Sequence, residues 1–412
     1  MLHWRLSRFA STLVAFALLA ALTGCGEGPI VPAPVIAPQS PYFGAPPPPP
    51  VSATPLPSPG ASGAIKVALL VPLSGANAGL GKAMLEAAQL ALFTTGGDRL
   101  TLIPRDTAGT PQGAASAARS AVADGAALIL GPLLAGEVET VKPVASAAHV
   151  NVLAFSTATQ LAGGNVFLMG FLPRQEIVRE VRFALDKGLH RFAALAPQTQ
   201  YGHLMTDALR DAATAGGGTV GKVEYLDPRG SDNAAAIQRL LASDTAAAPP
   251  PSVSFDALLL PEGGAELKQL VQQLKQAGLN TAQVRLLGSG LWDDPSIAGD
   301  AALDGGWFAA SPPATRREFD SRFQQTYGHP PPRLASLAFD AAALAGVLAK
   351  SGGGAPFSRE AILNPSGFTG VDGLFRFTPQ GLVQRGLAVL EVQPQGDVVV
   401  GPAPQSFQDL AY

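Results

Sequence analysis

Two glycine-rich stretches have the residue types of phosphate-binding loops, but neither has the context that this chemistry requires. In the stretch 75–82, Ala76 stands where a P-loop needs its first glycine, and Ala83 replaces the serine or threonine that should follow Lys82. The stretch 216–221 satisfies G-x-G-x-x-G, yet it follows a predicted helix and leads into a predicted strand, the reverse of the dinucleotide-binding order. We interpret it as a loop that ends a helix.

The other side chains that could do catalysis form no recognisable set. The chain has no G-x-S-x-G, H-E-x-x-H or S-x-x-K motif. Its five histidines are scattered over different elements; His203, beside Tyr201, could touch a binding site, and the alternative for it is a surface or capping role. Glu137 and Glu139 are two positions apart on a predicted helix and therefore face different ways. We predict a protein that is not an enzyme and uses no cofactor or metal.

The amino-acid composition excludes further classes of protein and partner. The 412 residues are 47% hydrophobic and 14% charged, with a formal net charge of −3, which gives no electrostatic reason to expect nucleic acid as a partner. The single cysteine excludes a disulfide framework and a cysteine-rich metal site. The length exceeds that of one ordinary core and predicts more than one compact unit.

The single cysteine directly follows a segment that is typical of a secretory signal. Basic residues precede an apolar run, Thr12 to Leu22, that is too short for a comfortable transmembrane helix. The end of this run, Leu22-Thr23-Gly24-Cys25, resembles the bacterial lipobox, which implies that residues 1–24 are removed and that Cys25 carries a lipid. Gly26 follows, where lipoproteins retained at the inner membrane usually have aspartate, so the resemblance favours the outer membrane. The alternative is an ordinary signal followed by a free thiol.

Residues 25–63 are predicted to form a proline-rich, disordered tether. The stretch from Gly28 to Gly63 has thirteen prolines and no Lys, Arg, Asp or Glu. It shows no apolar periodicity, so it has no core to form. It could be a spacer that holds the folded part away from a membrane, or a linker with no length requirement.

From residue 64 onward, strands and helices alternate. We predict strands at 65–72, 100–104, 126–130, 150–155, 191–196, 219–225, 257–260, 284–287, 307–309, 374–378 and 387–392. We predict helices at 82–93, 111–123, 136–148, 175–187, 203–214, 233–242, 265–276, 316–326 and 334–349. The short loops favour parallel strands covered by helices on both faces, which is an α/β fold.

An ordered set of segments gives this alternation a family resemblance. The segments are Ile65-Lys66-Val67-Ala68-Leu69-Leu70-Val71-Pro72-Leu73-Ser74-Gly75, Leu130-Gly131-Pro132-Leu133, Asn151-Val152-Leu153-Ala154-Phe155-Ser156-Thr157-Ala158-Thr159, Gln200-Tyr201-Gly202 and Phe368-Thr369-Gly370-Val371-Asp372-Gly373-Leu374-Phe375-Arg376-Phe377. Together they resemble the type 1 periplasmic binding proteins of the leucine-binding kind. The resemblance implies that 64–412 folds as two lobes, each a parallel sheet with helices on both faces, joined by three crossings. It places lobe one at about 64–171 and 306–380, and lobe two at about 172–305 and 381–412.

The resemblance also implies a ligand site between the lobes, at the carboxyl ends of the strands. The hydroxyl-rich loop of lobe one, which can donate to an anion, is kept in Ser156, Thr157 and Thr159. The aromatic residue of lobe two is kept in Tyr201. Ser74 and Asn77 could also line the site, or they only form the turn and cap the first helix.

Other positions depart from the amino-acid pocket of that family. The usual serine is missing from Leu133-Leu134-Ala135-Gly136, and no tyrosine precedes Pro261-Glu262. The stretch Gly288-Ser289-Gly290 lacks the acid that would pair with an ammonium group, and we interpret the nearby Asp293 and Asp294 as a helix cap or turn. A standard amino-acid pocket is therefore in question.

A narrower resemblance agrees with these departures. The pattern Gly131-Pro132-Leu133-Leu134 with Glu137-Val138-Glu139, and the closing Gln384-Arg385-Gly386-Leu387-Ala388-Val389, are similar to the penicillin-binding protein activators, outer-membrane lipoproteins that stimulate peptidoglycan synthases. We therefore predict a periplasmic regulator, anchored at Cys25 to the outer membrane, whose partner is a bifunctional peptidoglycan synthase. The alternative is a receptor that delivers an amino acid or related small ligand to an ABC importer.

Overall fold

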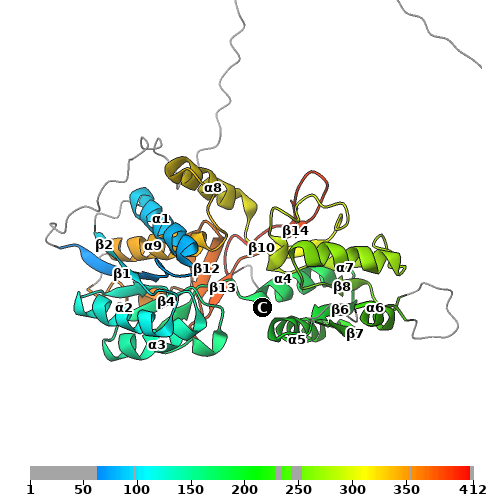
Figure 1. Cartoon of the computed structure of the whole chain (residues 1–412), viewed down its shortest axis with the longest axis horizontal. Helices are drawn as coiled ribbons and strands as arrows, with labels where there is room; N and C mark the ends of the chain where they lie inside the picture. The colour runs from blue at the N-terminus through cyan, green and yellow to red at the C-terminus, as the bar shows by residue number, and fades with distance from the viewer. Residues whose placement is uncertain (1–62, 96–98, 228–232, 243–252, 352–353, 409–412) are drawn as a thin grey trace, which may run out of the picture. The chain divides into compact units, whose positions relative to one another are not determined.

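The computed structural model describes most of the chain beyond the tether, namely residues 63–95, 99–227, 233–242, 253–351 and 354–408. The predicted signal peptide, the predicted lipidation site Cys25 and the predicted tether up to residue 62 lie outside these residues. The described part contains two main sheets and one small sheet, with helices packed on the main sheets (Figure 1). Within it, no helix is both long and apolar enough to span a membrane.

The first main sheet is parallel throughout and has the strand order β2-β1-β3-β4-β5. Its strands are β1 (Ile65–Val71), β2 (Leu100–Asp106), β3 (Leu128–Leu130), β4 (Asn151–Ala154) and β5 (Val166–Leu168). The apolar run of β1 is buried on both faces because side chains alternate along a strand. Ala68 and Leu70 pack against α2 (Pro111–Ala123) and α3 (Ala135–Ala147). Val67 and Leu69 face the opposite core.

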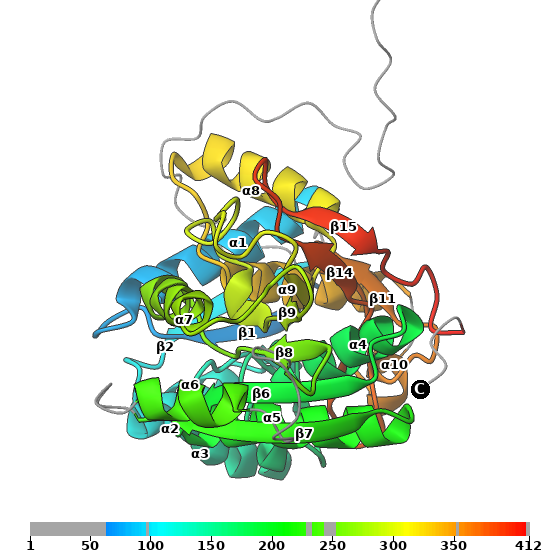
Figure 2. The same cartoon turned by 90° about the vertical axis from the view of Figure 1, so that its right-hand side faces the viewer.

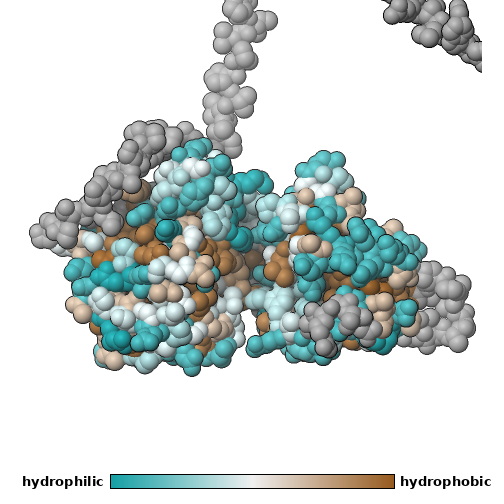
Figure 3. All heavy atoms as spheres, viewed as in Figure 1, coloured by the Kyte–Doolittle hydropathy of each residue, from teal (hydrophilic) through white to brown (hydrophobic). Residues whose placement is uncertain are grey.

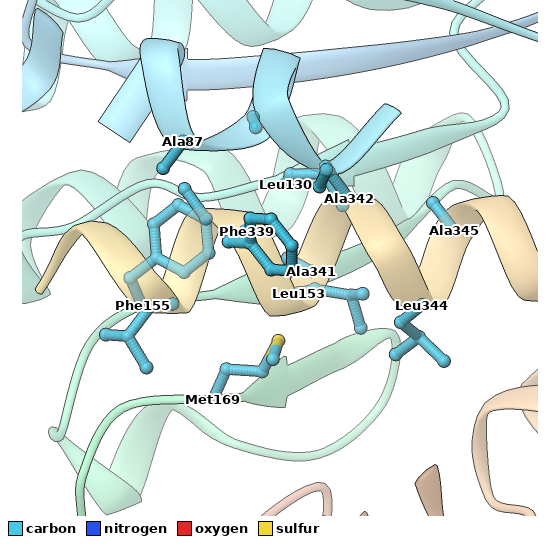
Figure 4. Packing of buried hydrophobic residues seen from close by; sticks show 14 of the residues in the cluster. Ala87, Leu130, Leu153, Phe155, Met169, Phe339, Ala341, Ala342, Leu344 and Ala345 are labelled. Carbon is cyan, nitrogen blue, oxygen red and sulfur yellow. The ribbon is translucent and has the colours of Figure 1, made fainter. Parts of the chain in front are cut away.

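That opposite core is built around two alanine-rich helices, α1 (Ala78–Thr95) and α9 (Ala335–Lys350). Small side chains such as Ala87, Ala341 and Ala345 are fully buried there, which lets the two helices approach each other closely. Figure 4 shows Phe339 and Ala342 on α9 beside α1, with the side chains of Phe155 and Met169 packed in the same cluster. A helix from much later in the sequence, α9, thus helps to cover this face of the first sheet.

The second main sheet has the order β15-β14-β10-β9-β8-β6-β7 (Figure 2). Its strands are β6 (Arg191–Pro197), β7 (Thr219–Leu226), β8 (Ala257–Leu259), β9 (Arg285–Leu287), β10 (Trp307–Ala310), β14 (Ala388–Glu391) and β15 (Val398–Gly401). One face is covered by α4 (Pro173–Asp186) and α5 (Gln200–Ala215), and the other by α6 (Asn233–Leu241) and α7 (Gly264–Gln276). The strands β6 to β10 pair in parallel, whereas β14 and β15 are antiparallel, so the prediction of a purely parallel sheet is wrong at this edge.

A small antiparallel sheet packs into the same core as α1 and α9. It consists of β11 (Phe368–Gly370), β12 (Gly373–Phe377) and β13 (Val383–Arg385). Its buried side chains share one core with those of α8 (Pro313–Tyr327), α9 and α10 (Arg359–Ile362). We call the first sheet, the small sheet and their helices the first lobe, and the second sheet with α4 to α7 the second lobe. On the face shown in Figure 3, hydrophilic and hydrophobic residues alternate over the surface of both lobes.

The chain passes between the lobes three times, at 169–172, 311–312 and 386–387. The predicted changes of lobe at 306 and 380 therefore differ from the structure. The strand β10 pairs with β9 and β14, which assigns 307–310 to the second lobe. The strand β13 pairs with β12, which keeps 383–385 in the first lobe. Strand pairing between distant segments, not local sequence, sets these two boundaries.

Helix α1 of the first lobe and helix α5 of the second lobe each approach the end of the preceding strand closely through a glycine. A Cβ on Gly81 in α1 would lie 1.9 Å from the carbonyl oxygen of Pro72, and a Cβ on Gly202 in α5 would lie 1.9 Å from that of Pro197. Only glycine fits such a contact. The glycines made 74–81 appear to be a loop, and the prediction that the helix begins at Lys82 is wrong because α1 already begins at Ala78.

Candidate functional site

The loop after β1 in the first lobe is fastened to the end of β2. Asp106 accepts hydrogen bonds from the backbone N–H of Leu73 (2.8 Å) and of Ser74 (3.2 Å), and from the Ser74 hydroxyl (2.6 Å). Ser74 is exposed, but its hydroxyl is committed to this turn. Asn77 is exposed immediately before α1, and its carbonyl accepts the N–H of Gly81 (3.0 Å). The geometry of both residues matches the turn and the helix start.

The hydroxyl-rich loop follows β4, at the carboxyl end of the first sheet. Ser156 is buried, and its Oγ accepts the N–H of Ala158 (3.2 Å), so it shapes the loop. Thr157 and Thr159 are exposed, the latter at the start of the short helix η1 (Thr159–Leu161). The crossing residue Gly170 packs against this loop, since a Cβ there would lie 2.6 Å from the carbonyl oxygen of Ser156. Two threonine hydroxyls therefore remain accessible beside the first crossing.

In the second lobe, Tyr201 lies in the first turn of α5, which Thr199 caps by accepting the N–H of Gly202. The phenol is mostly buried and hydrogen-bonds with Ser289, which follows β9. Burial raises the pKa of Tyr201 to about 12; the hydrogen bond with Ser289 opposes this shift, and the negative charges of Glu176 and Glu262 add to it. Tyr201 is therefore an uncharged hydroxyl at the carboxyl end of the second sheet, within electrostatic reach of two carboxyl groups.

Two carboxyl groups from α4, the fully buried Glu180 and the partly buried Glu176, hold the loop after β9 in place. Glu180 Oε1 accepts the N–H of Gly288 (3.0 Å), and Glu176 Oε2 accepts the N–H of Gly290 (2.8 Å). Burial raises the pKa of Glu176 to about 7 against the effects of the Gly290 N–H and Arg333. Burial also raises the pKa of Glu180 well above its usual range, and the charge of Glu176 adds to this shift against the effect of the Gly288 N–H.

Neither acid was among the predicted site residues, because the sequence suggested a carboxylate only within the loop 288–290 itself, where none is present. The structure brings them to that loop from a different element. Their spacing, i and i+4 on one helix face, was the available signal. That spacing places them side by side but does not reveal the loop that they contact.

A third carboxyl group, Glu262, follows β8 and is half-buried without a hydrogen-bond partner among the described residues. Burial raises its pKa, and the charge of Glu266 adds to the shift. Beside it, a Cβ on Gly263 would lie 3.1 Å from the Cβ of Leu291, which is 47% exposed. The result is an acid next to an exposed apolar side chain and close enough to Tyr201 to influence its pKa.

The predicted site residues therefore form two groups. Tyr201 hydrogen-bonds with Ser289 at the carboxyl end of the second sheet, and the charges of Glu176 and Glu262 influence its pKa. The hydroxyl residues of the first lobe lie at the carboxyl end of the first sheet, and among the described residues no hydrogen bond joins them to Tyr201. The ring of His203 packs at a tilt against Tyr225 of β7, with ring centroids 4.5 Å apart, and belongs to neither group. No cluster of His, Cys, Asp and Glu in the described part could hold a metal ion.

Comparison with known proteins gives one family and many similar folds. A family model described as periplasmic binding protein matches residues 64–397. A structure of a putative branched-chain amino acid ABC transporter from Rhodospirillum rubrum aligns with a TM-score of 0.70 and 21% identity, covering 82% of this chain and 100% of that one. No curated protein matches.

Two further structures were solved with ligands. The branched-chain amino acid transporter substrate binding protein LivJ from Streptococcus pneumoniae, in complex with isoleucine, aligns with a TM-score of 0.57 and 18% identity, covering 82% of this chain and 100% of that one. A solute binding protein of an ABC transporter from Rhodopseudomonas palustris, in complex with 3,4-dihydroxybenzoic acid, aligns with a TM-score of 0.57 and 20% identity, covering 83% and 99%. At these identities the alignments establish the fold alone.

Proposed function

The chain belongs to the periplasmic binding protein family, whose model matches residues 64–397, and from this premise we propose that it is a receptor that binds a small solute for an ABC importer. Family membership implies a periplasmic location. The similar structures above are substrate-binding proteins of ABC transporters, which supports the receptor over the synthase regulator predicted from the sequence.

The observation that carries the proposal is the half-buried Glu262 beside Tyr201. In open α/β sheets, ligands bind at the carboxyl ends of the strands, and both residues lie there. A carboxyl group that is buried without a partner costs free energy, and a ligand ammonium would offset this cost. Glu262 thus supplies, after β8, the acid that the stretch 288–290 lacks. The exposed Leu204 and Leu291 provide apolar surface in the same lobe.

The charge around Tyr201 further favours a ligand that carries an amine. Glu176 and Glu262 both influence Tyr201 through their negative charge. A ligand whose only charge is a carboxylate, such as the dihydroxybenzoate of the Rhodopseudomonas protein, would be repelled there. An amino acid could place its ammonium on Glu262 and its carboxylate on the hydroxyls of Thr157 and Thr159.

Replacing Glu262 with glutamine is expected to weaken the binding of isoleucine at least about tenfold, because the charged partner of the ammonium is lost. Titration calorimetry on the purified chain measures this, with isoleucine, 2-methylbutylamine and 3,4-dihydroxybenzoate as probes. The matched control is Glu139→Gln, which removes the same charge from an exposed position on α3 of the first lobe and should leave the affinity unchanged. Binding of dihydroxybenzoate but neither amine, or equal affinities for both variants, would contradict the proposal.

The second candidate, a regulator of a bifunctional peptidoglycan synthase, draws support from the sequence. Leucines replace the expected serine at 133–134, and they are half-buried in the structure. Co-purification of a synthase with this chain, with faster glycan polymerisation in a reconstituted assay, would support the regulator. Isoleucine binding that depends on Glu262, without a captured synthase, would support the receptor.

The lipid anchor at Cys25 and the outer-membrane location are also proposals, supported by the lipobox-like segment. The Cys25→Ser chain is expected to move from the membrane fraction to the soluble periplasmic fraction, because a protein without the lipid has no anchor. Immunoblots of fractionated cells measure this, and a density gradient assigns the native chain to the inner or outer membrane. An unchanged membrane association of the variant would contradict the anchor.

A further inference from the structure

One ion pair connects the two lobes next to the crossings. Arg333 precedes α9 in the first lobe, and its Nε donates to Oδ2 of Asp293 at 2.9 Å. Asp293 follows the short helix η2 (Gly290–Trp292) of the second lobe. This pair is not part of the ligand residues described above. It links a loop beside the candidate site to the opposite lobe.

The first-lobe end of this link is held firmly. Arg333 Nη1 donates to Oδ1 of the fully buried Asp372 (3.1 Å), and Nη2 donates to the hydroxyl of Ser311 (3.3 Å). The guanidinium carbon also lies 3.9 Å from the ring centroid of Phe171. Because Phe171 and Ser311 belong to two of the three crossings, Arg333 is fixed where the lobes are joined.

The second-lobe end is equally constrained. The residue before Asp293 is Trp292, whose side chain is fully buried in the core of the second lobe. The loop that leads to it is held by Glu176 and Glu180 through the N–H groups of Gly290 and Gly288. Asp293 therefore cannot follow Arg333 by a local loop movement. A rotation of one lobe against the other must lengthen or break the ion pair.

We propose that the Arg333–Asp293 pair is an interlobe strap that holds the two lobes in one relative position when no ligand is bound. Charged hydrogen bonds are short and directional, so a strap with two rigid ends restricts both the separation and the twist of the lobes. Removal of the pair should widen the range of lobe positions. This inference needs no ligand and is independent of the proposed solute.

The test measures distances between the lobes in the full chain. Spin labels are attached to two exposed positions, Ser146→Cys on α3 of the first lobe and Thr214→Cys on α5 of the second lobe. The background is Cys25→Ser, which removes the only native thiol. Double electron–electron resonance on the protein without ligand should give a narrow distance distribution. Asp293→Asn should broaden it and shift its mean, whereas Asp293→Glu, which keeps the charge, should restore most of the narrow distribution.

The matched control is Asp294→Asn, which removes the neighbouring charge and keeps the cap on the N–H of Ser296. Both residues of the strap are about one-third exposed, so about 1 M KCl should also broaden the wild-type distribution, by shortening the screening length to about 3 Å. This second measurement needs no folded variant. Identical distributions for wild type, Asp293→Asn and Asp294→Asn, with no effect of salt, would overturn the strap.

Discussion

Replacing Asp372 with asparagine is expected to lower the free energy of unfolding by about 3–5 kcal/mol, because it leaves buried cations without their shared counter-charge. Asp372 is fully buried. Its Oδ1 lies 3.1 Å from Arg333 Nη1 and 3.8 Å from Arg316 Nη1. Burial alone would raise the pKa of Asp372, but Arg333, Arg385 and Arg316 outweigh burial and hold it below the usual range.

Urea unfolding followed by circular dichroism measures this loss. The matched control is Asp320→Asn, which removes an acid that also pairs with Arg316, at 2.8 Å, but is 40% exposed. It should cost less than about 1 kcal/mol. The double variant Asp372→Asn/Arg385→Met should recover part of the loss, since it also removes a fully buried guanidinium whose Nε and Nη1 have no hydrogen-bond partner. Equal costs for Asp372→Asn and Asp320→Asn would show that the buried charge is not needed.

Replacing Glu176 with glutamine is expected to stabilise the protein at alkaline pH by up to about 3 kcal/mol. Folding raises the pKa of Glu176 from 4.5 to about 7, chiefly through burial. Between these values the folded state therefore binds more protons than the unfolded state. The free energy of unfolding thus falls as the pH rises from about 4.5 to 7. Glutamine can still accept the N–H of Gly290 but carries no charge to desolvate.

The measurement compares denaturant unfolding of wild type and Glu176→Gln from about pH 4 to about pH 8, where the difference should grow from near zero to its maximum. Glu180 is present in both proteins, so the difference chiefly reports on Glu176. Glu266→Gln provides the exposed control and should follow the wild-type profile. Parallel profiles for wild type and Glu176→Gln would indicate that Glu176 stays ionised at neutral pH.

Much of the fold was predictable because its signals are local. The helix α2 begins and ends at its predicted residues, since Thr110 accepts the N–H of Gly113 and Pro111 opens the first turn. The continuous apolar run of β1 indicated a strand buried on both faces. Local sequence could not assign β10 or β13 to a sheet, because their partners lie far along the chain.

The candidate site was predictable only in part, for the same reason. Tyr201 and the loop at 156–159 follow directly from strand ends, and the structure places them at the carboxyl edges of the two sheets. The acids beside Tyr201 arrive from α4 and from the end of β8. Arg333 shows no local pattern at all, and its role depends on Asp293 and Asp372, which only the folded chain brings to it.

The three crossings have a consequence for the order in which this chain can fold. The core of the first lobe needs α9, and Arg99 donates a hydrogen bond to the carbonyl of Ala349, 250 positions away. The second sheet needs β14, close to the C-terminus. Contacts over such separations form late and slowly. A nascent chain therefore cannot complete the first lobe before α9, or the second lobe before β14, has been synthesised. We expect that this delay keeps both lobes incomplete during synthesis, and an incomplete lobe is the state that a narrow export channel can admit.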